Sequence, residues 1–432
     1  MTSVLRTWKP MKLLLINHFP LEGSGSGVYT RNLAKALVER GHEVQVLVPE
    51  YKSVDTTREG FITHTVLFEE TGAEREPSAT LVPVLNFPFP CFTTHPRSHF
   101  TFYDMDQGQI EAYRGAFRGR LSEILETFEP EVIHAGHVWV LADLVRETGR
   151  PYVITSHGTD LMGYSRDERF RKNAAAAEKG ACRIITISRQ ADADFQSVFG
   201  LDAKRRTLIY SGCDTGVFHK KARSGVGLLS GFGFHMPPRH VVCFAGKLVA
   251  FKGVDVLLAA AARYEQSFEG QVATIIAGDG VLKPALLAQA EILGLKGIRF
   301  VGHQTQEKLA ELYSISDVFA MPSRSEPFGL AALEAMACGL PVVGTSAGGL
   351  DDIITKEVGR LVPVDDPLAL AERIVEILSL DGSVKEKMQQ ACIRYVETSF
   401  SWAATAERTE QVYLECLSEG QLKDNAGKPS EK

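Results

Sequence analysis

Two glutamates, Glu326 and Glu334, stand eight positions apart in the segment Glu326-Pro-Phe-Gly-Leu-Ala-Ala-Leu-Glu334. The first falls in a turn that contains Pro and Gly, and the second falls inside the helix that Gly329 opens. The amide groups of Phe328, Gly329 and Leu330 begin this helix, where they would suit a phosphate. Because carboxylates repel phosphate, the two acids are better suited to hydroxyl groups, such as those of a ribose and a hexose. The pattern therefore suggests a nucleotide-sugar site.

Two other interpretations of this pair need no nucleotide sugar. Acidic residues near a helix start complement the helix dipole, which contributes roughly 0.3–1 kcal/mol without any ligand. A retaining glycosidase would place two carboxyl groups about 5–5.5 Å apart. Eight residues of helix rise about 12 Å, so Glu326 and Glu334 are poorly placed to flank one bond. The pair counts as functional only if other site residues accompany it.

The composition indicates an ordinary globular protein. The 432 residues are 44% hydrophobic and 23% charged, which is enough chain for two domains with separate cores. A net charge of −6 favours neither nucleic-acid binding nor strong attraction to a membrane. The sequence contains no apolar stretch near the roughly 20 residues of a membrane span.

The seven cysteines are scattered and contain no Cys-x-x-Cys pair. This pattern predicts neither a disulfide framework nor a zinc site, and it agrees with a reducing cytoplasm. We therefore expect a cytoplasmic protein, with a peripheral place at the inner face of the membrane left open. Met11 is a candidate start of the chain, in which case residues 1–10 form an unstructured extension.

Short apolar runs alternate with helical patterns along the whole chain, which predicts parallel sheets covered by helices on both faces. A Gly-rich stretch within residues 211–240 interrupts the alternation and predicts an interdomain linker. The fold class is therefore α/β, with two Rossmann-like domains that face each other across a cleft. We predict a domain at 11–225, a second domain at 238–398, a C-terminal helix at 400–418 that packs back on the first domain, and a disordered tail at 419–432.

The predicted strands are short and mostly apolar. They fall at 12–16, 43–48, 132–134, 152–156, 183–187 and 207–210, and then at 241–245, 273–277, 298–301, 318–321, 341–344 and 359–362. Residues 68–106 form the longest irregular part of the chain, which predicts either a binding element or an ordinary covering loop.

The loop Gly23-Ser-Gly-Ser-Gly27 follows the first predicted strand and opens a helix. Its Gly25 and Gly27 let a ligand approach the backbone closely, and the helix start favours negative charge. A dinucleotide fingerprint fits poorly, because Thr30 stands where its third glycine would fall. The loop therefore predicts contact with a phosphate or with an acceptor, but not with a nicotinamide cofactor.

Two further loops follow strands and would open toward the same crevice. One carries His157, directly after the strand at 152–156. A single His is more often structural, but its place at the end of a strand makes it a candidate site residue. The other carries Lys247 and Lys252 between glycines, and two lysines on one loop can neutralise a diphosphate without a metal.

The ordered set of motifs resembles the retaining glycosyltransferases of the GT-B fold, of the family-4 or glycosyl transferases group 1 type. The resemblance covers nearly the whole chain and is specific as a set, although each motif alone is common. The matching segments are the glycine loop at 23–27, His157-Gly-Thr-Asp160, Ser211-Gly-Cys-Asp214 with Phe218, Gly246-Lys-Leu with Lys252-Gly253, Gly278-Asp-Gly280, Pro322-Ser323, Glu326-x7-Glu334, Gly339-Leu-Pro341 and Gly348-Gly349.

The resemblance implies a role for each candidate residue. Glu334 would bind the ribose hydroxyls and Glu326 the hexose hydroxyls of a UDP- or GDP-hexose donor. His157 would line the sugar and the scissile bond. The donor diphosphate would be held by the lysines and the helix amides, and the glycine loop would pack against the donor phosphate and the acceptor. These groups are Lys247, Lys252, Phe328, Gly329 and Leu330, with Gly25 and Gly27 in the loop.

The implied reaction is a front-face transfer with retention, in which the departing phosphate oxygen takes the proton of the acceptor hydroxyl. His157, Lys252 and Glu326 would be the catalytic residues, no metal or other cofactor would be required, and the acceptor would be a sugar, a lipid or a small molecule. Alternatives on the same scaffold are a sugar phosphorylase, a nucleotide-sugar epimerase and a non-catalytic nucleotide-sugar-binding protein.

The chain departs from the family pattern in two places. The family usually has Arg where Lys247 stands, so the charge is kept but bidentate phosphate contact is lost. It usually has Asn-Gly-Val-Asp where this chain has Ser211-Gly-Cys213-Asp214, which predicts that Cys213 is a packing substitution. Neither departure changes the implied function.

Overall fold

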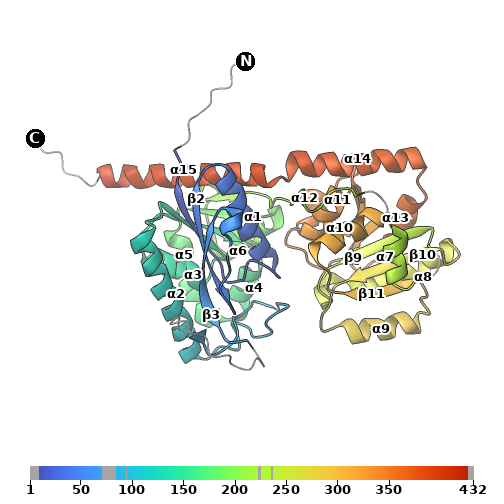
Figure 1. The fold of residues 1–432 in the computed structure, drawn as a ribbon, viewed down its shortest axis with the longest axis horizontal. Helices are drawn as coiled ribbons and strands as arrows, with labels where there is room; N and C mark the ends of the chain where they lie inside the picture. The colour runs from blue at the N-terminus through green and yellow to red at the C-terminus, as the bar shows by residue number, and fades with distance from the viewer. Residues whose placement is uncertain (1–8, 71–83, 94, 222–224, 235–236, 427–432) are drawn as a thin grey trace, which may run out of the picture. The chain divides into compact units, whose positions relative to one another are not determined.

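The structure is a computed structural model that describes residues 9–70, 84–93, 95–221, 225–234 and 237–426. Most of the extension predicted at 1–10 therefore lies outside the described residues. The chain folds into two compact units (Figure 1). Unit 1 consists of Met1–Ile187, Ala191–Tyr210 and Trp402–Lys432, and unit 2 consists of Ser188–Gln190 and Ser211–Ser401.

The border between the units lies at Tyr210–Ser211, not at residue 225. The segment that we expected to be a linker belongs to unit 2 and contains helix α7 (Gly225–Gly231). Its glycines are compatible with a short helix because Leu229 is buried and the helix packs against α10 of unit 2. Composition alone does not reveal such tertiary support.

Unit 1 is built on one eight-stranded parallel sheet with the order β4-β3-β2-β1-β5-β6-β7-β8. The strand order reverses between β1 and β5, which pair directly, so a topological switch point lies at their carboxyl ends. Its strands are β1 Lys12–Ile16, β2 Glu43–Glu50, β3 Ile62–Phe68, β4 Val84–Leu85, β5 Val132–Gly136, β6 Tyr152–Ser156, β7 Arg183–Thr186 and β8 Arg206–Leu208.

Helices cover both faces of this sheet. Its strands are mostly apolar, so both faces must be shielded from water. Leu14 and Ile16 of β1 face a core shared with α2, α3 and α5. The intervening Leu13 and Leu15 face an opposite core shared with α1 and α15. The helices of unit 1 are α1 Gly25–Glu39, α2 Gln107–Thr127, α3 Val140–Glu147, α4 Thr159–Arg166, α5 Arg171–Gly180, α6 Arg189–Phe199 and α15 Trp402–Ala426.

Helix α15 packs beside α1 within unit 1 (Figure 1), and Tyr413 and Cys416 are fully buried there. The helix continues to Ala426, so residues 419–426 of the predicted tail are helical, and 427–432 lie outside the described residues. Two ion pairs join it to β7, because Arg183 contacts Glu415 at 3.4 Å and Glu419 at 2.6 Å. The last helix is therefore part of the unit 1 core.

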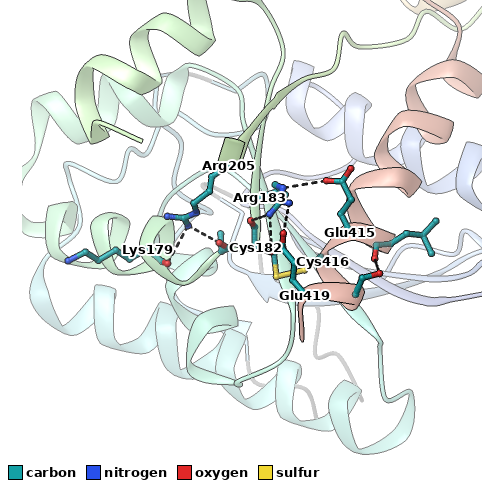
Figure 2. Close-up of a disulfide and its surroundings, with 10 residues drawn as sticks. Lys179, Cys182, Arg183, Arg205, Glu415, Cys416 and Glu419 are labelled. Carbon is teal, nitrogen blue, oxygen red and sulfur yellow. Dashed lines mark hydrogen bonds and ion pairs between the residues drawn. A yellow bond between two sulfur atoms is a disulfide. The ribbon is translucent and has the colours of Figure 1, made fainter. Parts of the chain in front are cut away.

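Cys182 and Cys416 form a disulfide between the start of β7 and α15, next to the ion pairs of Arg183 (Figure 2). The two residues are 234 positions apart, and their Cα atoms are 5.4 Å apart. The cysteine pattern predicted no disulfide framework, and it gave no sign of this single pair. Cysteine spacing does not encode the docking of α15 against unit 1, so cysteine usage gives no argument for a reducing compartment.

The irregular segment predicted at 68–106 supplies aromatic side chains to the core, and its residues 71–83 and 94 lie outside the described part. Phe89 and Phe102 are fully buried, and Arg97 forms an ion pair with the buried Glu50 at 2.8 Å. The described residues of this segment therefore cover the sheet of unit 1.

Unit 2 is built on a six-stranded parallel sheet with the order β11-β10-β9-β12-β13-β14. This is the Rossmann order 3-2-1-4-5-6, and its topological switch point lies between β9 and β12. The strands are β9 His240–Ala245, β10 Val272–Ala277, β11 Ile298–Gly302, β12 Val318–Met321, β13 Val342–Thr345 and β14 Gly359–Val362.

Helices also surround the sheet of unit 2. One core joins α8, α9 and α13 to alternate strand residues such as Val242 and Phe244, while α11 packs against α10 and α14. The helices, apart from α7, are α8 Val254–Ser267, α9 Lys283–Ile292, α10 Gln306–Ile315, α11 Leu330–Ala337, α12 Leu350–Ile353, α13 Pro367–Leu378 and α14 Gly382–Ser399. In the described part of the chain, none of the helices combines the length and apolar character needed to cross a bilayer.

Candidate functional site

Loops at the carboxyl ends of β9 and β12 pack directly on each other in unit 2. The β9 loop ends in a short turn, Ala250–Lys252, followed by Gly253 in the left-handed conformation with φ of 65°. A Cβ atom on Gly253 would lie 1.9 Å from the carbonyl oxygen of Pro322, so only glycine fits. The amide of Arg324 also donates to the carbonyl of Phe251 at 2.7 Å. These contacts fix the two loops at the switch point.

The same contact brings Lys252 and Glu326 together. The Nζ atom of Lys252 lies 2.5 Å from Oε2 of Glu326, and their side chains are only 16% and 8% exposed. The backbone of Glu326 is held as well, because its carbonyl accepts from the amide of Gly349 at 2.7 Å. Two residues for which we expected separate contacts with a donor therefore form one ion pair.

Helix α11 begins immediately beyond this pair. Gly329, its N-cap residue, has a φ of 105°, which turns the chain from the loop into the helix. Phe328 is buried, and its ring lies 6.3 Å from that of Phe400. The first amides of a helix have no carbonyl one turn earlier to bond. The predicted amides of Phe328, Gly329 and Leu330 thus lie in the same loop and helix start as Glu326.

Glu334 lies in the second turn of α11, on the side of the helix near Asp214. Burial raises the pKa of Glu334 to about 8, and the negative charge of Asp214 acts in the same direction. The carboxyl group therefore holds a proton at neutral pH. The structure places Glu334 and Glu326 on one short segment but in different surroundings, since Glu326 pairs with the ammonium of Lys252 and Glu334 lies near the carboxylate of Asp214.

We expect this proton to make the stability of unit 2 depend on pH. The unfolded chain releases it near the ordinary pKa of 4.5, whereas the folded protein keeps it until about pH 8. The stabilising contribution is therefore complete below pH 4.5 and is lost as the pH rises through about 8. Urea denaturation of the wild type and of Glu334→Gln at a series of pH values measures this. The variant should gain relative stability as the pH rises, and parallel curves would contradict the raised pKa.

Lys247 lies earlier in the β9 loop and is partly exposed. The loop after β10 packs against this segment, because the amide of Leu248 donates to the carbonyl of Asp279 at 2.9 Å. A Cβ atom on Gly278 would lie 1.9 Å from the carbonyl oxygen of Gly246. Close backbone packing thus explains the glycines of the Gly278-Asp-Gly280 motif.

Substituting Gly253 by alanine should disturb the site more than a matched substitution of Gly294. Both glycines are left-handed, with φ of 65° and 66°, so both variants carry a penalty of about 1–2 kcal/mol. Only Gly253 has a carbonyl in the way, since no atom lies within 4 Å of a Cβ on Gly294. Urea denaturation should therefore show a larger loss of stability for Gly253→Ala. Equal losses would mean that the β12 loop moves aside freely.

In unit 1, His157 lies beyond the end of β6 in a cluster of buried histidines. Its ring is 4.8 Å from that of His137, which in turn is 5.8 Å from that of His18. Burial lowers the pKa of His157 to about 3, and His137 adds to the effect. The pKa of His137 is also lowered to about 3 by burial. His157 is therefore a neutral imidazole, which can form hydrogen bonds but carries no charge at neutral pH.

His137 follows β5 at the switch point of unit 1, and sequence reasoning missed it. It is fully buried, has a φ of 76°, and among the described residues neither of its ring nitrogens finds a hydrogen-bond partner. A strained backbone and unpaired polar atoms often mark functional positions. The available signal was its place shortly after the strand predicted at 132–134, since His157 was singled out by its place directly after the strand at 152–156.

The glycine loop begins α1, as expected. The side chain of Ser24 caps the helix and accepts from the amide of Gly27 at 3.1 Å, so this amide already has a protein partner. A Cβ atom on Gly27 would lie 1.9 Å from the carbonyl oxygen of Pro20. Gly25 is the first residue of the helix. Gly27 thus has a packing role that is independent of any ligand.

Asp160, the last residue of the His157-Gly-Thr-Asp160 motif, is fully buried. Its carboxylate accepts from the amide of Val138 at 2.9 Å and from the hydroxyl of Ser156 at 3.1 Å. It therefore ties the segment after β6 to the segment after β5. This contact holds the histidine segments in place.

The comparisons with known proteins agree with this architecture. The family model for Glycosyltransferase Family 4 matches residues 23–217, and the model for Glycosyl transferases group 1 matches residues 235–398. A D-inositol 3-phosphate glycosyltransferase from Salinispora arenicola is 32% identical over 338 residues, which cover 72% of this chain and 74% of the relative. A glycogen synthase from Mycobacterium tuberculosis is 28% identical over 423 residues, covering 94% of each chain.

The crystal structure of the Anabaena protein HepE in complex with UDP and glucose has a TM-score of 0.68 to this chain. The two proteins are 20% identical, and the match covers 93% of this chain and 98% of HepE, so it shows a shared fold. The predicted GT-B-type architecture of two Rossmann-like domains is confirmed. Given the two family models and the relative at 32% identity, this chain belongs to the glycosyl transferases group 1 family and is a glycosyltransferase of the family-4 type.

Proposed function

We propose that the protein is a retaining hexosyltransferase that moves a hexosyl group from a nucleotide-diphosphate sugar to an acceptor hydroxyl. The observation that carries the proposal is the Lys252–Glu326 pair, held at the switch point of unit 2 beside the first amides of α11. Ligands of open α/β sheets bind at this position. A UDP-hexose is the first donor to test, because HepE was solved with UDP and glucose.

The ion pair gives Lys252 and Glu326 complementary tasks. An ammonium group has three N–H donors, so Lys252 can keep its bond to Oε2 of Glu326 and still donate to an oxygen of the diphosphate. Glu326 can then accept from a hexose hydroxyl through Oε1. One pair of side chains would thus orient the sugar relative to its leaving group, which is the kind of positioning that accelerates transfer.

Other residues complete the proposed donor contacts. Lys247 and the amides of Phe328, Gly329 and Leu330 bind the diphosphate, so that cationic charge and helix amides take the place of a metal. Glu334 binds the ribose hydroxyls. Unit 1 contributes the neutral His157 to the sugar, and Gly25 and Gly27 to the acceptor side.

The chemical step is a front-face substitution with retention. The bond from the anomeric carbon to the phosphate oxygen breaks, and a bond to the acceptor oxygen forms on the same face of the sugar. The departing phosphate oxygen takes the proton of the acceptor hydroxyl, so the products are the glycosylated acceptor and a nucleoside diphosphate. The protein supplies stabilisation of the charge that grows on the diphosphate.

A thermal-shift panel with UDP, GDP, ADP and their sugars tests donor binding. A ligand at 100 times its dissociation constant adds about 2.7 kcal/mol of stability, which gives a visible shift. We expect one nucleotide class to raise the melting temperature of the wild type and of Lys283→Ala, but not of Lys252→Ala. Lys283 is a partly exposed lysine of the same unit. No shift with any nucleotide would contradict the proposal.

Product analysis tests the reaction once the donor is known. With an acceptor and EDTA present, nuclear magnetic resonance should show a product with the donor's anomeric configuration. An inverted product would contradict retention, and loss of transfer in EDTA would contradict the metal-free mechanism. Release of a sugar phosphate would indicate a phosphorylase, and a changed donor without any acceptor would indicate an epimerase.

A further inference from the structure

Unit 1 contains a small cavity next to His157. It has room for about one water molecule, the smallest volume that can be hydrated. Helix α1, strands β1, β5 and β6 and the residue after β6 line it. The lining residues are Leu15, Tyr29, Thr30, Leu33, His134, Gly136, Thr155 and His157.

Two of the lining side chains carry a buried polar atom without a protein partner in the described part of the chain. These atoms are the hydroxyl of Tyr29 and Nε2 of His157. Tyr29 is 3% exposed and His157 is 8% exposed, and their rings meet edge to face with centroids 5.0 Å apart. Leaving such an atom unpaired costs about 1–3 kcal/mol. Two such atoms on one cavity point to a shared partner.

The other polar groups of the cavity wall are already satisfied. His134 bonds through Nδ1 to the hydroxyl of Tyr413 at 2.6 Å and through Nε2 to that of Thr155 at 2.7 Å. Thr30 donates to the carbonyl of Ser26 at 3.0 Å and accepts from an asparagine amide. The remaining demand for hydrogen bonds therefore comes from Tyr29 and His157.

The hydroxyls of Thr155 and Thr409 lie near that of Tyr29, but in the described part of the chain neither comes within hydrogen-bond geometry of it. Thr155 bonds instead to Nε2 of His134 at 2.7 Å, and Thr409 donates to the carbonyl of Thr405 at 2.8 Å. Tyr29 itself stays protonated, since burial raises its pKa to about 12. His157 stays neutral, as described above, so its Nε2 either donates or accepts one hydrogen bond, depending on the tautomer. A water molecule can donate and accept at once, and it fits both atoms.

We propose that this cavity is a binding site for one water molecule, which bridges the hydroxyl of Tyr29 and Nε2 of His157 and fixes the orientation of the His157 ring. Tyr29 is then a positioning residue that acts on His157 through the water. The water site depends only on the structure of unit 1. Its effect on glycosyl transfer rests on the proposed function, because that proposal places His157 at the sugar.

Crystal structures of the wild type, Tyr29→Phe and Tyr413→Phe test the site directly. Each variant removes one buried hydroxyl, and Tyr413 serves as the control because its hydroxyl bonds to His134 and not to Tyr29 or His157. We expect an ordered water within hydrogen-bond distance of Tyr29 and His157 in the wild type. It should persist in Tyr413→Phe and be lost in Tyr29→Phe. A wild-type cavity without water, or a water that persists in Tyr29→Phe, would overturn the proposal.

Solution measurements give an independent check. Nitrogen-15 resonances of the His157 ring should change in Tyr29→Phe and stay unchanged in Tyr413→Phe. If the protein transfers sugar, kcat should fall about tenfold in Tyr29→Phe with the donor KM unchanged, which corresponds to the loss of one hydrogen bond. A protein without transfer activity would contradict the proposed function, but the structures would still decide the water site.

Discussion

Replacing Lys252 or Glu326 by alanine should lower the rate of glycosyl transfer at least a hundredfold while the protein stays folded. A hundredfold loss corresponds to about 2.7 kcal/mol of transition-state stabilisation. Each substitution removes one contact with the donor and also releases the remaining partner, because Nζ and Oε2 are 2.5 Å apart. Lys252→Ala further removes positive charge where the leaving diphosphate gains negative charge. Initial rates at saturating donor, together with thermal unfolding, measure both parts of this expectation.

Two variants make the result specific. Lys283→Ala removes a partly exposed lysine that pairs with Asp279 at 2.8 Å, and its rate should stay near the wild type. Glu326→Gln keeps the size of the side chain and a hydrogen-bonding group but loses the charge. It should lie between the wild type and Glu326→Ala if Glu326 both orients the sugar and holds Lys252. Near-normal turnover of Lys252→Ala or Glu326→Ala would show that the assigned role is wrong.

Removing the Cys182–Cys416 disulfide should lower the free energy of unfolding of unit 1 by about 2–4 kcal/mol. The disulfide joins residues 234 positions apart, so it restricts the unfolded chain strongly. It also holds α15, which supplies buried side chains to the core around α1. The ion pairs of Arg183 with Glu415 and Glu419 remain without it, but these partners are 57% and 48% exposed. Exposed pairs contribute little, so they should not compensate.

Urea denaturation with and without a reductant measures this effect. The reductant should shift the transition of the wild type, and it should leave the double variant Cys182→Ser, Cys416→Ser unchanged. Cys392 is free and is buried in the folded chain, so unfolding makes it accessible. Alkylation of the unfolded but unreduced protein, followed by mass spectrometry, should therefore label Cys392 and leave Cys182 and Cys416 unlabelled. Labelling of Cys182 and Cys416 to the same extent as Cys392 would contradict the disulfide.

The elements with strong local signals could be predicted from the sequence. The strand predicted at 152–156 is β6. Helix α2 also has a local start signal, because Asp106 and Gln109 form a capping box there. Strand β3 was missed because only the second half of Ile62–Phe68 is buried, and its first half reads as polar. Such a strand forms because it pairs with β2 in the folded sheet, which the local sequence does not show.

The candidate site was predicted as a set of residues but not as an arrangement. Lys252 and Glu326 were chosen from their loops, yet their ion pair depends on the contact between Gly253 and Pro322, which no local pattern encodes. His137 was missed because its burial and its unpaired nitrogens exist only in the fold. The disulfide has the same cause, since helix α15 brings Cys416 to β7 from the far end of the chain.

The way in which unit 1 is assembled from distant segments has a consequence for biosynthesis. Its sheet is complete at Tyr210, but the helix that covers one side of it begins only at Trp402. About 190 residues of unit 2 must leave the ribosome in between, which takes roughly 10–40 s at 5–20 residues per second. Throughout that interval the nascent chain exposes the apolar surface that Tyr413 and Cys416 later bury. Newly made molecules should therefore engage chaperones at this surface until α15 has been synthesised and packs on it.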